Sequence, residues 1–234
     1  DQMTIYGQNL DWMNPVTGYV IINKRGVQKS VLHWKGNWPA SKKDQRSPVM
    51  WTSQYGSVTF TYIGRDFIDG GMNEVGLMVD EASLMAQYPP DDGTSPGISC
   101  GQWMQYQLDN FETVTEVLDH ISDLRPDGEE WHYLIADRFG DVCAIEYLDG
   151  TPTVYRKKDM EYPILTNTTY AHALTHIPMD KAFGGDIDIA SGTDSYGRFV
   201  KAANLIRMFP ENDTNIVDYA FHILDAVSNE TTRR

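Results

Sequence analysis

The sequence has 234 residues, of which 41% are hydrophobic and 22% charged, a composition typical of a globular protein and not of a disordered one. Its formal net charge of −14 argues against nucleic acid and anionic membrane surfaces as partners, because both are bound through clustered Lys and Arg. The length requires no second domain, and no apolar run approaches the roughly 18 residues of a membrane span, so no membrane partner is expected.

Strands dominate the first part of the chain. The expected strands are residues 3–9, 19–23, 27–34, 56–63 and 75–84. The second and third are expected to pair as a hairpin around the turn at residues 24–26, and a Gly-rich turn precedes the last. The Pro- and Asp-rich residues 89–93 then break the pattern.

Helices and further strands are expected after that break. The expected helices are 101–110, 114–124, 196–208 and 216–227, and the expected strands are 133–137, 141–147, 152–155 and 164–167. Thr113 is in position to cap the helix at 114–124, with Glu116 three residues further on. An antiparallel meander separated from other strands by a helix pair predicts an α+β fold.

Four short polar signatures are not required by the fold pattern alone. They are residues 5–12 (IYGQNLDW), 70–77 (GGMNEVGL), 165–167 (LTN) and 195–199 (SYGRF). A strand that only fills a core has no need of Gln, Asn and Asp so close together. In this order, the signatures resemble those of the choloylglycine hydrolase and penicillin V acylase family of N-terminal-nucleophile amidases.

The resemblance implies a four-layer αββα sandwich, with residues 1–234 forming a single N-terminal-nucleophile hydrolase domain that is incomplete at both ends. It implies hydrolysis of a linear amide C–N bond in a bile salt, penicillin V or another N-acyl amide. The family's nucleophilic cysteine should precede Asp1 and is not in this chain. No cofactor and no metal are implied. A homotetramer is common in the family. A periplasmic or secreted location is typical of its Gram-negative branch, and a cytoplasmic location is the alternative.

Four residues match the family's catalytic positions. Asp11 would orient the amino-terminal nitrogen of the nucleophile, although an Asp at a strand end also caps turns. Asn73 and Asn167 would polarise the substrate and donate to the oxyanion. Alternatively, Asn73 is a turn residue and Asn167 begins a glycosylation sequon. Arg198 would hold Asp11 or a substrate oxygen, although a lone helix Arg more often forms a surface ion pair.

Two further residues are expected to bind substrate. Trp12 follows the aspartate and would line the acyl pocket, although a Trp is more often part of a core. Gln8 departs from the family pattern, which has an arginine there. Since a nearby cation lowers the pKa of a thiol, Gln8 predicts a less activated nucleophile or a different substrate contact. It also favours the alternative function, a non-catalytic relative that binds acyl or steroid ligands.

The remaining reactive side chains are assigned no role. Cys100 and Cys143 are expected to be two free buried thiols, since two cysteines make no disulfide framework. His172 and His176 are four residues apart and could share one helix face, but no third metal ligand is evident, so no metal site is expected.

Overall fold

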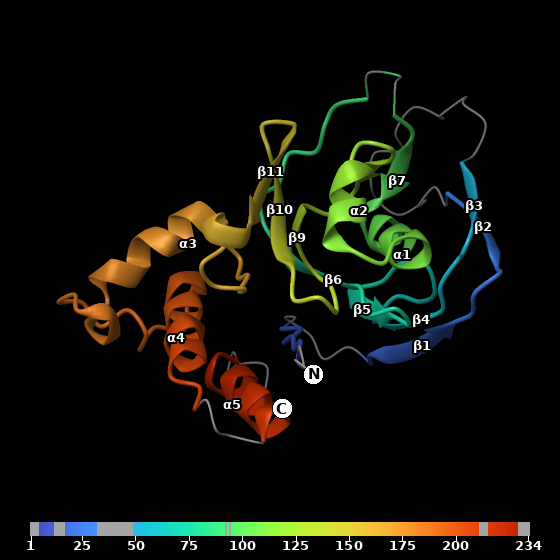
Figure 1. Cartoon of the computed structure of the whole chain (residues 1–234). Helices are drawn as coiled ribbons and strands as arrows, with labels where there is room; N and C mark the ends of the chain where they lie inside the picture. Colours follow the sequence, from blue (N-terminus) through green and yellow to red (C-terminus); the bar gives the residue numbers. More distant parts are fainter. Residues whose placement is uncertain are drawn as a thin grey trace. The chain divides into compact units, whose positions relative to one another are not determined.

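The computed structural model describes residues 5–11, 17–31, 49–91, 93, 95–210 and 215–228 (Figure 1). The chain divides into two compact units, a larger one formed by Gly18–Met160 and a smaller one formed by Asp1–Thr17 with Glu161–Arg234. Within the described ranges, no helix combines the length and apolar character needed to cross a membrane.

The larger unit is built on an antiparallel seven-stranded sheet. In spatial order its strands are β1 (Tyr19–Asn23), β4 (Ser57–Thr61), β5 (Gly70–Asn73), β6 (Met78–Ser83), β9 (Trp131–Ala136), β10 (Val142–Leu148) and β11 (Thr151–Arg156). The strands predicted from residue 56 to residue 155 are therefore confirmed, with small shifts of their ends. Strand β5 was not predicted, because the glycines at its start indicated only a turn.

The predicted hairpin at 19–23 and 27–34 is wrong. The turn exists, with Gly26 at a φ of 75°, but β1 pairs with β4, while β2 (Gln28–Ser30) pairs with β3 (Met50–Thr52). The chain is diverted by Ser53, whose backbone oxygen accepts from Gly26 N at 2.7 Å and whose hydroxyl accepts from Val27 N at 3.1 Å. These bonds carry the chain after the turn away from β1 and into a second, two-stranded sheet.

One face of the large sheet is covered by helices. Helix α1 (Cys100–Asn110) packs against β5 and β6, and α2 (Val114–Asp119) follows it (Figure 1). The buried core between them includes Trp103, Leu108, Val79, Tyr133 and Ile145. The predicted capping box is confirmed, because Thr113 Oγ1 accepts from Glu116 N at 3.2 Å and the Glu116 carboxylate accepts from Thr113 N. Helix α2 ends earlier than predicted. The short parallel pair β7 (Gly97–Ser99) and β8 (Arg125–Asp127) lies beside α1.

The other face of the sheet is apolar near its β1 edge. Val20 lies opposite Phe60 and Ile22 opposite Val58, so all four side chains share one face, and each is exposed. A sheet that packs against a second sheet needs an apolar face of this kind. The mixture of a large antiparallel sheet and separate helices confirms the α+β class.

The smaller unit contains α3 (Tyr170–His176), α4 (Ser195–Arg207) and α5 (Ile216–Ala226), with short 3₁₀ turns at Ile177–Met179 and Lys181–Phe183. The two closing helices are confirmed. Two other predictions are wrong. The strand predicted at 3–9 does not form over residues 5–9, while residues 3 and 4 lie outside the described ranges, and residues 164–167 form only an isolated bridge between Thr166 and Thr168. The chain segment at 5–11 is held by a side-chain bond instead, from Asn9 Nδ2 to Leu224 O at 2.6 Å.

Asn73 joins the sheet to α1. Its Nδ2 donates to the carbonyl oxygens of Leu108 and Phe111 at 2.9 and 2.8 Å, and its Oδ1 accepts from the backbone N–H groups of Val75 and Leu77 at 3.2 and 2.9 Å. The side chain therefore shapes the β5–β6 turn and at the same time binds the carboxyl end of α1. It is almost fully buried, with 4% of its surface exposed.

The glycines around Asn73 allow this close packing. A Cβ on Gly71 would lie 2.5 Å from Val58 O, and Gly76 has a φ of 89°. Neither position tolerates a side chain without displacement of backbone. The GGMNEVGL signature is therefore explained by the fold of the larger unit.

We expect Asn73→Ala to lower the free energy of unfolding of the larger unit by about 3 kcal/mol or more, because two buried carbonyls and two N–H groups lose their partner. The half-buried Asn110, whose Nδ2 donates only to Tyr106 O, gives the matched control, and Asn110→Ala should cost about 1 kcal/mol. Urea denaturation of both variants measures the difference. Equal losses in the two variants would contradict the role given to Asn73.

Candidate functional site

Arg198 lies in the first turn of α4, and the start of this helix is firmly fixed. Asp194 caps it, with Oδ1 accepting from Gly197 N at 2.7 Å. Gly197 itself packs on the preceding loop so closely that a Cβ would lie 2.4 Å from Gly192 O. The SYGRF signature thus needs its glycine to bring the first turn of α4 against residue 192, which sets the direction in which Arg198 leaves the helix.

Asn167 is presented by a tight turn that is tied to the same helix. Thr168 N donates to Thr166 O at 2.7 Å, which closes the turn, and Thr166 Oγ1 donates to Ser195 O at 3.1 Å. Arg198 Nη2 then donates to Asn167 Oδ1 at 2.8 Å. Two of the predicted catalytic residues, 31 positions apart in sequence, are therefore in direct contact.

This contact orients the Asn167 amide. Because the guanidinium occupies Oδ1, the amide nitrogen Nδ2 lies on the opposite side, and Asn167 is an exposed residue. Arg198 is half-buried, and its Nε makes no hydrogen bond with any residue that the structure describes. The arrangement places a cation behind the amide oxygen of Asn167, at an exposed turn.

Gln8 and Asp11 belong to the segment 5–11 of the same unit, and both are half-buried. The segment rests on α5 through the Asn9 bond and through Gly7, where a Cβ would lie 2.8 Å from Leu224 Cδ1. That Asp11 and Gln8 meet the Arg198–Asn167 pair stays a prediction. Trp12 lies outside the described residues.

Asn73 belongs to the larger unit, and its contacts account for it without a catalytic role. Both hydrogens of its amide are donated, to the carbonyls of Leu108 in α1 and of Phe111 directly after it, and its backbone N–H is donated to Leu77 O at 2.9 Å. No N–H of this residue is left for an oxyanion in this arrangement. Its participation in catalysis, and any approach to Asn167, stay predictions.

A group of carboxylates in the larger unit, with Asp69 and Asp80 buried and Glu81 half-buried, was missed by the sequence reasoning. Burial raises the pKa of Asp69 to about 6 and, together with the negative charges of Asp69 and Glu129, raises the pKa of Glu81 to about 8. Burial also raises the pKa of Asp80 well above its usual value, with the charge of Glu81 adding to the effect. Two successive acids inside the apolar strand β6 were the signal that could have revealed this group.

The two cysteines are free and buried, as predicted. Burial raises the pKa of the Cys143 thiol to about 12, and the pKa of the Cys100 thiol still further. Since the thiolate is the reactive form, neither cysteine is suited to act as a nucleophile near neutral pH.

His172 and His176 do share a helix, α3, and pack around Tyr196 of α4. The ring of His176 stacks on Tyr196 with centroids 4.1 Å apart, and the Tyr196 hydroxyl lies 3.2 Å from His172 Nδ1. Within the described ranges, no group of three His, Cys, Asp or Glu side chains is placed to hold a metal ion. The pair is explained by packing between two helices.

Comparisons with known proteins agree on one family. The family model described as linear amide C–N hydrolases, choloylglycine hydrolase family, matches residues 1–232. A penicillin V acylase from Pectobacterium atrosepticum is 30% identical over 176 residues, which cover 67% of this chain and 46% of that protein. The chain thus aligns with about half the length of this curated relative.

Solved structures show the same likeness. Penicillin V acylase from Agrobacterium tumefaciens matches with a TM-score of 0.77 and 28% identity, covering 94% of this chain and 67% of that one. A variant of conjugated bile acid hydrolase from Clostridium perfringens matches with a TM-score of 0.73 and 18% identity, covering 94% of this chain and 74% of that one, which is a likeness of fold alone. The predicted fold class, that of the N-terminal-nucleophile hydrolases, is confirmed.

The buried carboxylates predict a pH-dependent stability. The folded state raises the pKa of Glu81 from 4.5 to about 8, so it binds the proton more tightly than the unfolded chain does. The stabilisation from Glu81 is therefore complete below about pH 4.5 and is lost as the pH rises through 8. We expect the free energy of unfolding to fall between pH 5 and pH 8.5 by on the order of 3 kcal/mol from this residue.

Urea denaturation at a series of pH values tests this. Glu81→Gln, which keeps the neutral shape, should flatten the decline, whereas Glu130→Gln, at an exposed position nearby, should preserve it. A Glu81→Gln protein with the same pH dependence as the wild type would rule out the assignment.

Proposed function

The chain belongs to the choloylglycine hydrolase family of linear amide C–N hydrolases, and on that premise we propose that the protein hydrolyses the linear amide bond of an N-acyl compound. Conjugated bile salts, penicillin V and long-chain acyl homoserine lactones are the substrate classes to compare. The observation that carries the proposal is the hydrogen bond between Arg198 and Asn167, at a turn and a helix start that are both fixed.

The proposed nucleophile is an N-terminal cysteine that precedes Asp1 and is not part of residues 1–234. The α-amino group takes the thiol proton as the sulfur attacks the amide carbonyl carbon, and the C–N bond then breaks as the leaving amine takes that proton from the terminal ammonium group. The resulting thioester is hydrolysed by water, with the same amino group as the base, which releases the carboxylic acid and restores the thiol. A free α-amino group titrates near pH 8, so it can accept a proton at neutral pH.

In this proposal Asn167 is the oxyanion donor. With Oδ1 held by Arg198, the Nδ2 hydrogens are directed to the other side, where one of them stabilises the negative charge of the tetrahedral intermediate. A donor of this kind contributes roughly 3 kcal/mol to the transition state. Asp11 accepts from the terminal amino group and orients it. Asn73 is left out, because its N–H groups are donated to protein carbonyls.

Gln8 supports a second candidate function. An amide at this position carries no charge with which to lower the pKa of a neighbouring thiol, and this favours a relative that binds acyl or steroid ligands without cleaving them. The two candidates share the binding of a small amide or acyl compound and differ in turnover. A homotetrameric assembly stays a prediction.

We expect Arg198→Ala in the complete, cysteine-bearing protein to lower kcat/KM for the best of the three amide substrates by about 100-fold, because the Asn167 amide loses the group that orients it. Arg207→Ala, in the last turn of the same helix, removes the same charge and should leave kcat/KM unchanged. Amine release gives the rate, and thermal unfolding shows that both variants are folded.

The outcomes separate the two candidate functions. Wild-type turnover in Arg198→Ala would contradict the proposed site. Binding of the substrates to the complete wild-type protein without amine release would replace the amidase with the non-catalytic binder.

Gln8 gives a prediction of its own. In the complete protein we expect the thiol pKa to exceed 7, and Gln8→Arg to lower it by about one unit, since a cation stabilises the thiolate. The pH dependence of alkylation by iodoacetamide measures this pKa, with Gln54→Arg, outside the segment 5–11, as the control. A wild-type thiol pKa below 7 would sink the interpretation of Gln8.

A further inference from the structure

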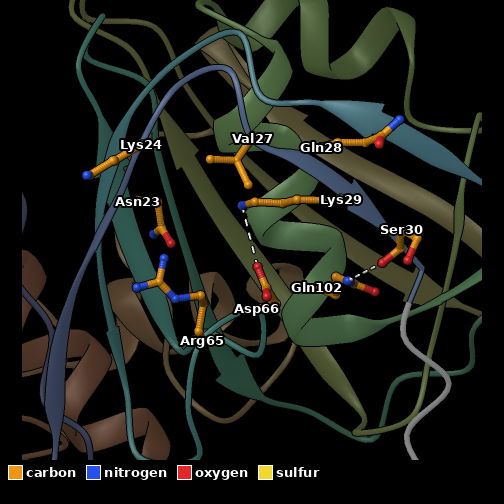
Figure 2. Close-up of a pocket in the computed structure, with 9 residues that line it drawn as sticks. All are labelled: Asn23, Lys24, Val27, Gln28, Lys29, Ser30, Arg65, Asp66 and Gln102. Atoms are coloured by element: carbon orange, nitrogen blue, oxygen red, sulfur yellow. Dashed lines mark hydrogen bonds and ion pairs between the residues drawn. The ribbon is translucent and has the colours of Figure 1, made fainter.

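The larger unit contains a cavity of about 230 Å³ that is not part of the proposed site. It lies at the end of β1, under the turn to β2, and reaches α1 (Figure 2). Its lining residues are Asn23, Lys24, Val27, Gln28, Lys29, Ser30, Arg65, Asp66 and Gln102. The size is well above the roughly 30 Å³ share of one water molecule and suits a small metabolite.

Arg65 supplies an unused cation at this cavity. Lys29 also lines it, but its ammonium is neutralised by Asp109, at 2.9 Å, and by Asp66, at 3.5 Å. Arg65, by contrast, forms no hydrogen bond or ion pair with any described residue, and in Figure 2 its guanidinium points toward the amide of Asn23. A planar guanidinium without a partner is suited to a carboxylate.

Asn23 supplies an unused acceptor. Its side chain is buried, with 3% of the residue exposed, and its Nδ2 donates to Ser57 Oγ and Thr59 Oγ1 at 3.2 and 3.1 Å. Its Oδ1 is buried and accepts no hydrogen bond. A buried acceptor without a donor costs free energy that a ligand N–H can recover.

Asp66 provides the second acceptor. Its Oδ1 receives no hydrogen bond and only the long ion pair from Lys29, so the carboxylate is incompletely satisfied. On the side of Asp66 away from Asn23 and Arg65, Gln102 Nε2 donates to Ser30 O at 2.9 Å, and both residues line the cavity (Figure 2). Besides the paired Lys29 and the exposed Lys24, the guanidinium of Arg65 and two acceptors therefore line a short polar space.

We propose that this cavity binds a small zwitterion of the free amino-acid class, with its carboxylate on Arg65 and its ammonium group between Asn23 Oδ1 and the Asp66 carboxylate. The site lies outside the residues assigned to amide hydrolysis and does not depend on that assignment. A simple anion would satisfy Arg65 and leave both acceptors unmet. A simple amine would satisfy the acceptors and leave Arg65 unmet.

Titration calorimetry of the protein with free glycine, acetate and methylammonium tests the proposal. Glycine is expected to bind at least about tenfold more tightly than either of the other two, because only glycine offers both charges. Acetate that binds as tightly as glycine would reduce the cavity to an anion site and overturn the zwitterion. So would the absence of saturable glycine binding at millimolar concentrations.

Two variants locate the binding. Arg65→Ala should weaken glycine binding at least about tenfold, whereas Arg25→Ala, an exposed arginine of the neighbouring turn that does not line the cavity, should leave it unchanged. Asp66 has a left-handed backbone conformation, with a φ of 68°, which Asn also adopts readily. Asp66→Asn should therefore weaken the binding of glycine but not that of acetate. Equal affinities in wild type and Arg65→Ala would refute the proposal. Thermal unfolding confirms that each variant is folded.

Discussion

The architecture of the larger unit depends on one buried amide, that of Asn73. It fixes the β5–β6 turn and the carboxyl end of α1 in a single set of four hydrogen bonds. Once α1 is placed, its Asp109 accepts from Trp51 Nε1 at 2.7 Å and from Lys29 Nζ, and so binds the β2–β3 pair. The cavity beside Lys29 therefore depends on an interaction at the carboxyl end of α1.

Sequence patterns were sufficient to predict those structural features that depend only on residues close together in the chain. Hydrophobic alternation and helical periodicity located most strands and helices, and the Thr113–Glu116 capping box was predicted because its spacing alone determines it. Pairing between distant segments was not accessible in this way. Strand β1 pairs with β4 because Ser53 accepts hydrogen bonds from the turn after β1 and so directs the following residues into another sheet. The sequence of residues 19–34 contains no signal of this distant contact.

The candidate site shows the same division. The motifs singled out Asn167 and Arg198, which are in contact, and Asn73, whose position in a glycine-rich turn has a structural explanation. The buried acids were missed because an acidic side chain in a strand is normally expected to face water. Only the three-dimensional packing shows that Asp80 and the neighbouring Asp69 are covered.

Those covered acids change the charge that the protein carries. The formal value of −14 counts every carboxyl group as ionised, yet the pKa of Glu81, raised to about 8, keeps this group largely protonated at neutral pH in the folded state, and burial shifts the pKa of Asp80 in the same direction. Folding therefore takes up protons from the solvent, and unfolding near pH 7 releases them. The enthalpy of unfolding measured by calorimetry will accordingly include the ionisation heat of whichever buffer receives these protons.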